Sequence, residues 1–297
     1  MIFFKASNFK FIVELFGFGL CIAGVWYLID FLSRIDLVPH LVTLSGVKLL
    51  GLIFLTICLT LAYTLIALCW RAILSDCGGQ ISLSKAQSVF SLSNLGKYVP
   101  GNFLHIAGRQ VLAMREGLPG WIVAKSQVIE ISLLALTSAV FVAIFWFISQ
   151  FGDISIFVST LTFPLIIVVS VFGLRWLGFP GSASAVLGYS VYHFVGGVVF
   201  ALLFFLLSDD IPHDASLGFF LISAYVASWF IGLITPGAPA GLGVREAVLI
   251  GLLANVVPNE AILSVAVLLS RAMGFISDLA YFLIFHTLNV QKLSANE

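Results

Sequence analysis

The sequence predicts an all-α, polytopic transmembrane helical bundle, and its composition, its low charge and the length of its apolar runs each support this fold class. Of the 297 residues, 61% are hydrophobic and only 9% are charged, whereas an ordinary soluble domain carries about a quarter charged residues. The mean hydropathy is +1.13. Lipid cannot hydrogen-bond a bare backbone, so spanning segments must be helices or closed barrels. Apolar runs of about 20 residues without period-two alternation favour helices.

Seven apolar runs are each long enough to cross the bilayer as a helix, since about 30 Å of hydrocarbon is covered at about 1.5 Å per residue. They lie at residues 11–30, 49–70, 126–150, 154–174, 183–207, 217–235 and 261–287. Two further stretches, 81–115 and 236–258, are apolar in pieces and are interrupted by Gly and Pro, which is typical of half-helices or re-entrant segments. Counting either stretch as a crossing gives eight spans. We therefore expect seven to eight spans with two broken or re-entrant helical segments, in a single domain over 1–297 with repeat halves at 1–150 and 183–290.

The basic residues fall on one side of the predicted spans. Lys5 and Lys10 precede the first span and Arg175 follows the fourth. A cluster follows the second span, and it comprises Arg71, Lys85, Lys97, Arg109, Arg115 and Lys125. The alternate loops hold only Arg34 and Lys48. By the positive-inside rule, we expect a multi-pass protein of the cell inner (plasma) membrane with a cytoplasmic amino terminus, while the side of the carboxyl terminus stays open.

Charge and cysteine content exclude several function classes. The formal net charge is zero, so we expect no nucleic-acid partner. The four cysteines, Cys21, Cys58, Cys69 and Cys77, have no metal-ligand spacing and are expected to be small buried hydrophobes. The sequence shows no nucleophile-base pair, phosphate-cradling glycine loop or zinc signature. We therefore expect no metal, no cofactor and no catalytic residue, and the sequence favours a protein that is not an enzyme.

Segment 81–95 predicts a short helix. Ser84 stands three residues before Gln87, which is the spacing of a capping box at a helix start. The helix is expected either to lie along the cytoplasmic interface or to be a soluble connector.

The two interrupted stretches share one pattern, in which Pro-Gly is followed by seven residues and then by Arg. The first runs from Pro100-Gly101 to Arg109 and the second from Pro236-Gly237 to Arg245. Proline disfavours helix for the residue before it and glycine accepts angles that other residues avoid, so each Pro-Gly should end one helix and let another begin. A half-helix that begins inside the membrane directs free N–H groups at an anion such as a phosphate, and Arg adds a matching fork of donors. Such paired interruptions indicate a binding site, although Pro-Gly can also serve only close helix packing.

These motifs carry a family resemblance. With GKYVPGNFLHIAGRQ at 96–110 and ITPGAPAGLGVREAVLIGLL at 234–253, the chain resembles the lysylphosphatidylglycerol synthase transmembrane-region family, also called flippase-like. The resemblance extends over nearly the whole chain and implies a module that moves an aminoacylated phospholipid across the bilayer. In the multiple peptide resistance factors this module precedes a cytosolic aminoacyltransferase domain. Because the chain ends at Glu297, soon after its last span, we expect the membrane module without the synthase domain.

Charged residues within or beside the apolar runs are the candidate binding residues. They are Arg109, Glu130, Arg245, Glu246, Arg271 and Asp278. Each isolated charge near the bilayer centre costs about 2.5 to 3.5 kcal/mol on insertion scales, so burial indicates pairing, a watery cavity or a ligand. Arg271 and Asp278 are seven residues apart on one helix, too distant to pair directly, and should face partners on other helices.

Two interpretations of these charges stay open. In the first, the three arginines pair with the three acids and fix the helix register. In the second, Arg109 and Arg245 bind a lipid phosphate, and Glu130 or Asp278 holds them when the site is empty. Either acid is alternatively a proton carrier.

Further candidate residues come from the interrupted segments themselves. Lys97, Pro100, Gly101, Pro236 and Gly237 complete the predicted substrate-binding set, with snorkelling to the interface as the alternative role of Lys97. His105 and His193 are expected to be packed, hydrogen-bonded histidines.

Together these features favour translocation of a phospholipid, an aminoacylated lipid or a polyprenyl-linked lipid, so the expected partner is a membrane lipid or a lipid-linked glycan. A membrane-embedded glycosyl or headgroup transferase is one alternative, because Asp209 and Asp210 are paired acids of the kind that bind a divalent cation. An accessory subunit of a partner enzyme in lipid or polysaccharide synthesis is another.

Overall fold

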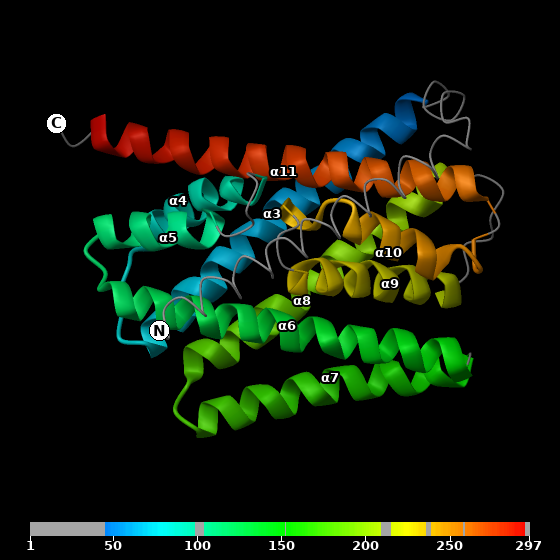
Figure 1. Ribbon diagram of the computed structural model, residues 1–297, viewed down its shortest axis with the longest axis horizontal. Helices are drawn as coiled ribbons and strands as arrows, with labels where there is room; N and C mark the ends of the chain where they lie inside the picture. Colours follow the sequence, from blue (N-terminus) through cyan, green and yellow to red (C-terminus); the bar gives the residue numbers. More distant parts are fainter. Residues whose placement is uncertain are drawn as a thin grey trace, which may run out of the picture.

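The protein is a bundle of long, apolar helices. The computed structural model describes residues 45–98, 104–151, 153–208, 215–235, 239–257 and 259–294, and all regular structure within these ranges is helical. Five helices in the described ranges are long and apolar enough to cross a membrane. Figure 1 shows the long helices running roughly along one axis of the molecule, with shorter helices packed among them. These features are those of a multi-pass membrane protein.

The long helices are α3 (Gly46–Asp76), α6 (Gly120–Phe151), α7 (Asp153–Trp176), α8 (Pro180–Leu207), α9 (Ala215–Ile234) and α11 (Glu260–Ser294). The short elements are α4 (Leu83–Asn94), η1 (Leu95–Tyr98), α5 (Leu104–Arg115), η2 (Pro239–Gly241) and α10 (Val244–Leu253), of which η1 and η2 are 3₁₀ turns. The short elements coincide with the two stretches that the sequence predicted to be broken.

The predicted spans agree with the helices in part. The helices α3, α6, α8, α9 and α11 contain the spans expected at 49–70, 126–150, 183–207, 217–235 and 261–287. The span expected at 154–174 lies in α7, a helix of 24 residues, of which Leu161–Trp176 is an apolar stretch. The span expected at 11–30 lies outside the described residues. A count of seven to eight spans therefore stays a prediction.

The most extensive helix contact joins α3 and α8. A Cβ added at Gly181 would lie 2.0 Å from the carbonyl oxygen of Ala72, and one added at Gly188 would lie 2.2 Å from Sγ of Cys69. The two backbones therefore approach closely, as small residues allow in membrane helices. Asp76 at the end of α3 accepts a hydrogen bond from the backbone N–H of Gly181 at 2.9 Å and so caps the start of α8.

The described cysteines are free thiols packed in or beside the apolar core. Cys69 and Cys77 are buried and Cys58 is partly buried, which confirms the expectation for these three. Burial raises the pKa of the Cys77 thiol above its ordinary value of 9.0, because a thiolate would lose its hydration. Cys21 lies outside the described residues.

The short helix predicted near residue 81 is present, but its cap differs from the prediction. Ser82 is the N-cap of α4 and its Oγ accepts a hydrogen bond from the backbone N–H of Lys85 at 3.4 Å. The capping box predicted from Ser84 and Gln87 is therefore wrong, because the helix begins two residues earlier. Gln87 is buried, donates to the carbonyl oxygen of Thr64 at 3.1 Å and accepts a hydrogen bond from Tyr281. The helix α4 thus packs between α3 and α11, and is not a soluble connector.

Candidate functional site

The first interruption folds η1 back against the start of α5. A Cβ added at Gly96 would lie 2.9 Å from the backbone nitrogen of His105, so the two backbones are in direct contact there. Lys97 in η1 and Arg109 in α5 both line the same cavity.

In the second interruption, the described residues 239–243 lead into α10 through η2. Ala240, Gly241 and Gly243 have positive φ angles of 50°, 69° and 79°. This region is open to glycine but costs a residue with a Cβ about 1 kcal/mol. The carbonyl oxygen of Ala240 accepts a hydrogen bond from Nη2 of Arg271 at 3.2 Å, which fixes the turn to α11. The turn places Arg245 in the first turn of α10.

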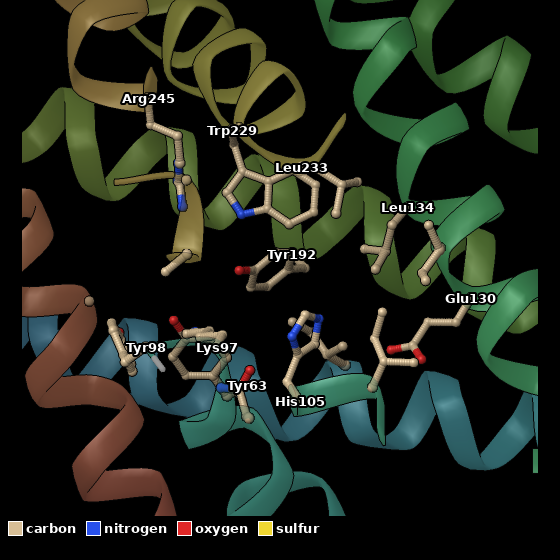
Figure 2. A pocket seen from close by; sticks show the side chains of 18 of the residues that line it. Tyr63, Lys97, Tyr98, His105, Glu130, Leu134, Tyr192, Trp229, Leu233 and Arg245 are labelled. Carbon is tan, nitrogen blue, oxygen red and sulfur yellow. The ribbon is translucent and has the colours of Figure 1, made fainter. Parts of the chain in front are cut away.

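The two interruptions meet at one cavity of about 260 Å³. The turns η1 and η2 are in contact, so segments more than a hundred residues apart in the chain share one site. Figure 2 shows Arg245 and Trp229 entering from one wall and Lys97 and His105 from the opposite wall, with Glu130 reaching in from α6. Apolar side chains of the core complete the walls, and they are Ile66, Ile106, Ile131, Leu134 and Leu233.

The cavity lies near the middle of the helical bundle, about halfway along the long helices. At about 1.5 Å per residue, Glu130, Tyr192 and Arg271 lie about 15–18 Å from the first residue of their helices. In Figure 1, α6 and α8 begin at one end of the bundle and α11 begins at the other, so the site is reached at about the same depth from both ends. Half of the hydrocarbon thickness is about 15 Å. Charged groups at this depth need partners or a ligand.

Four cations line the cavity, and three of them are paired with carboxylates. The pairs are Arg109 with Glu130, Lys97 with Asp278 (Nζ to Oδ2, 2.7 Å) and Arg271 with Glu246 (Nε to Oε1, 2.5 Å). Asp278 also accepts hydrogen bonds from Nδ2 of Asn94 at 2.6 Å and from the hydroxyl of Tyr98. Glu130, Glu246 and Asp278 are each 3% exposed or less. Losing a partner would leave a buried charge uncompensated.

Arg271 and Asp278 therefore face partners on other elements, which confirms that prediction. Arg271 contacts α10 through Glu246, whereas Asp278 contacts η1 through Lys97. Lys97 does not extend to the interface, since its Nζ also lies 5.0 Å from the ring centroid of Tyr63. The interpretation that the three arginines pair with the three acids is wrong, because Lys97 takes the place of Arg245.

Arg245 is the fourth cation. No ion pair joins it to a carboxylate within the described ranges, and its Nε has no hydrogen-bond partner there. Its guanidinium carbon lies 5.9 Å from the ring centroid of Tyr225, which is within the range of a cation–π contact. In the part of the chain that the structure describes, the four cations thus exceed their three carboxylates by one positive charge.

Arg109 lines the cavity and contacts Phe90 and Glu130. It is 5% exposed, and its guanidinium carbon lies 4.2 Å from the ring centroid of Phe90. One of its Nη groups pairs with Glu130, while its Nε has no partner among the described residues. Donor capacity therefore remains on both arginines of the repeated motif.

Aromatic side chains with polar atoms also line the cavity, and the sequence analysis did not single them out as binding residues. They are Tyr63, Tyr98, Tyr192, Tyr225 and Trp229. The ring centroids of Tyr63 and Trp229 each lie 6.2 Å from that of Tyr192. Tyr and Trp are usually enriched at the membrane interface. A Tyr or Trp in the middle of an apolar run is therefore the sequence feature that could have identified these residues as part of a site.

The two histidines have different surroundings. His193 is buried, and its Nε2 lies 3.3 Å from the carbonyl oxygen of Leu134, which confirms the expected packed, hydrogen-bonded histidine. His105 lines the cavity, and its Nδ1 has no hydrogen-bond partner in the described part of the chain. The expectation of a packed, hydrogen-bonded histidine is therefore not met at Nδ1 of His105.

The remaining candidate residues are placed as follows. Glu246 and Asp278 do not line the cavity but hold the lining cations Arg271 and Lys97. The Pro-Gly pairs themselves, Pro100, Gly101, Pro236 and Gly237, and the acids Asp209 and Asp210 lie outside the described residues.

Neither protein-family models nor curated proteins give a match to this chain. The fold and the chemistry of the cavity therefore carry the functional argument.

Proposed function

We propose that the protein is a flippase-like transporter that binds the phosphate of an anionic amphiphile in this cavity and moves the molecule across the membrane. One observation carries the proposal: Arg245, a cation without an ion pair among the described residues, faces a cavity at the middle of the helical bundle. A buried positive charge in this position is stabilised by an anion that arrives as a ligand.

A phosphate suits the donors that surround the cavity. Guanidinium groups present planar sets of N–H donors that match phosphate oxygens. The helices α5 and α10 both begin at the cavity, with Arg109 and Arg245 within their first two turns. Part of the dipole of α10 is already offset by Glu246 in its first turn, so the arginine side chains provide the main attraction.

An amphiphile suits the rest of the walls. The cavity combines these cations with aromatic and aliphatic side chains, and the helices that line it carry exposed apolar residues such as Phe54 and Trp121. A ligand with a charged headgroup and a hydrocarbon part would find both environments within one site. The aromatic groups offer surfaces for the headgroup portion beyond the phosphate.

The resemblance to the lysylphosphatidylglycerol synthase transmembrane-region family supports the translocation of a lipid with a phosphodiester, since it rests on the two motifs that flank the cavity. In this proposal the segments around residues 81–115 and 236–258 are re-entrant halves of an internal repeat, with their breaks at the substrate. The phosphate would contact Arg245 directly and would compete with Glu130 for Arg109.

The topology follows from the basic residues. The helices α3 and α7 finish at the end of the bundle at which α11 finishes (Figure 1), and Arg71 and Arg175 lie in the last two turns of these helices. With this end cytoplasmic, the proposal places the protein in the plasma membrane with the carboxyl terminus on the cytoplasmic side.

Lipid exchange in proteoliposomes tests the proposed function. Vesicles containing the protein and phosphatidylglycerol labelled on its acyl chain are treated with a membrane-impermeant quencher, and the quenchable fraction is followed with and without an ion gradient. The wild type should bring the inner-leaflet lipid to the quencher, and Arg245→Gln should abolish this. Arg175→Gln is the matched control, because Arg175 is exposed and lies outside the cavity. No exchange by the wild type under either condition would contradict the proposal, whereas turnover of a lipid donor in detergent would favour the transferase alternative.

A further inference from the structure

The charges around the cavity bear on how many negative charges the headgroup of the ligand carries. We infer that the site selects a headgroup with one negative charge, a phosphodiester, over a dianionic phosphomonoester and over a zwitterionic lipid. This inference rests on the proposed function and names the substrate class of the same site.

The described charged residues of the cavity carry one excess positive charge. Three ion pairs neutralise Lys97, Arg109 and Arg271, and the described carboxylates leave Arg245 as one excess positive charge. A monoanion brings the occupied site to neutrality. A dianion would leave one uncompensated negative charge and a zwitterion one uncompensated positive charge, and both are unfavourable where water is scarce.

Two of the three pairs are built to persist when the ligand binds. Asp278 holds Lys97 together with the hydrogen bonds from Asn94 and Tyr98. Arg271 forms an ion pair with Glu246 and donates a hydrogen bond to the carbonyl oxygen of Ala240. These partners keep two of the lining cations occupied, so a phosphate cannot recruit them without leaving a carboxylate buried alone.

The packing around Arg245 fixes the position of its side chain at the cavity. A Cβ at Gly232 would lie 2.3 Å from Cγ of Arg245, and one at Gly241 would lie 2.7 Å from its Cδ. The aliphatic part of Arg245 therefore runs between two glycines, which sets the direction of its guanidinium group toward the cavity. The Nε–H groups of Arg245 and Arg109 have no partners among the described residues, so both arginines that line the cavity keep donor capacity that a phosphate oxygen can use.

Binding of a lipid series to the purified protein tests the charge rule. Phosphatidylglycerol, phosphatidic acid and phosphatidylcholine with the same acyl chains are compared by native mass spectrometry at about pH 8, where a phosphomonoester is a dianion because its second pKa is about 6. We expect the wild type to bind phosphatidylglycerol at least about tenfold more tightly than the other two lipids. Arg245→Gln should reduce the affinity for phosphatidylglycerol to that for phosphatidylcholine.

Glu130→Gln is the decisive variant, because it raises the excess charge from one to two and should move the preference to phosphatidic acid. Glu116→Gln is the matched control, since Glu116 is exposed and pairs with Lys85 outside the cavity, and it should keep the wild-type preference. If Glu130→Gln does not fold, Gln127→Glu in the cavity wall lowers the excess charge to zero and should remove the preference for phosphatidylglycerol.

The outcomes separate the inference from the proposed function. Equal affinity of the wild type for the three lipids, or an unchanged preference in folded Glu130→Gln, overturns the charge rule even where lipid exchange in proteoliposomes is observed. Absence of both lipid exchange and anionic-lipid binding overturns the proposed function and the inference with it.

Discussion

The aliphatic part of Arg245 lies directly against Gly232, where a Cβ would come within 2.3 Å of Cγ of the arginine. Gly232 belongs to α9 and Arg245 to α10, so the contact joins the two helices on either side of the second interruption. Gly241 in the turn bounds the same groove. The second motif thus both begins a helix and leaves room for the arginine that follows.

Gly232→Ala should therefore reduce lipid binding without a change at any charged residue. The new methyl group must displace the stem of Arg245, which moves the guanidinium group out of its position in the cavity. We expect affinity for phosphatidylglycerol to fall about tenfold, since misplacing a charged donor costs about 1.5 kcal/mol or more. Native mass spectrometry measures the affinity. Gly218→Ala on the same helix is the control, because its Cβ would meet only Phe205 at 3.8 Å, and equal affinities of the two variants would contradict the role of the groove.

Asp278→Asn should destabilise the protein. Asp278 is 1% exposed and is the acceptor for Lys97, Asn94 and Tyr98. Removing its charge leaves the Lys97 ammonium without its counter-ion, which costs about 3 kcal/mol in the free energy of unfolding. Thermal unfolding in detergent should show a clear drop in Tm. Glu116→Gln breaks an exposed pair with Lys85, worth about 0–1 kcal/mol, and a Tm loss as large as that of Asp278→Asn would argue against a buried, stabilising network.

The same substitution at Gly243, the N-cap of α10, and at Gly251 within α10 should have opposite effects. Gly243 has φ of 79°, so Gly243→Ala forces a Cβ into the left-handed region and should lower the free energy of unfolding by about 1–2 kcal/mol. Gly251 has no atom within 4 Å of its Cβ position, and Gly251→Ala should raise the free energy of unfolding by up to about 1 kcal/mol through helix propensity. Thermal unfolding of the two variants decides the point. A neutral Gly243→Ala would show that the turn before α10 adopts another conformation.

Packing between α3 and α8 should be sensitive to one methyl group. Gly188→Ala would place a Cβ 2.2 Å from Sγ of Cys69, and overpacking of this kind costs about 1–3 kcal/mol. The double variant Gly188→Ala with Cys69→Ala removes the sulfur and should recover most of the lost Tm. Failure of the double variant to recover any stability would mean that another neighbour limits this interface.

The sequence predicts the helical fold and much of the site because local patterns encode both. Long apolar runs locate the described helices, and the repeated Pro-Gly and Arg spacing identifies Arg109 and Arg245, which the structure brings to one cavity. Charged residues are rare within apolar runs. Glu130 and Arg271 stand in such runs, so the sequence likewise identifies them as residues with a specific partner or ligand.

Other features depend on tertiary contacts that no local pattern contains. The pairing of Lys97 with Asp278 joins η1 to α11, and periodicity along either segment gives no information about that distance. Tyr63, Tyr192 and Trp229 come from three different helices and look like ordinary apolar-run aromatics until the helices are packed. The cap at Ser82 was misplaced because two serines stand within one turn, and helix ends are the least certain feature of a sequence pattern.

Photo-crosslinking of a phosphatidylglycerol that carries a diazirine next to its phosphate tests the central claim most directly. After irradiation of the protein in vesicles, peptide mapping by mass spectrometry identifies the labelled residues. The account predicts label on the cavity walls around residues 104–109 and 239–245, lost in Arg245→Gln and retained in Arg175→Gln. Label confined to outward-facing residues of α3 and α7, with no difference between the two variants, would contradict a phosphate site in the cavity.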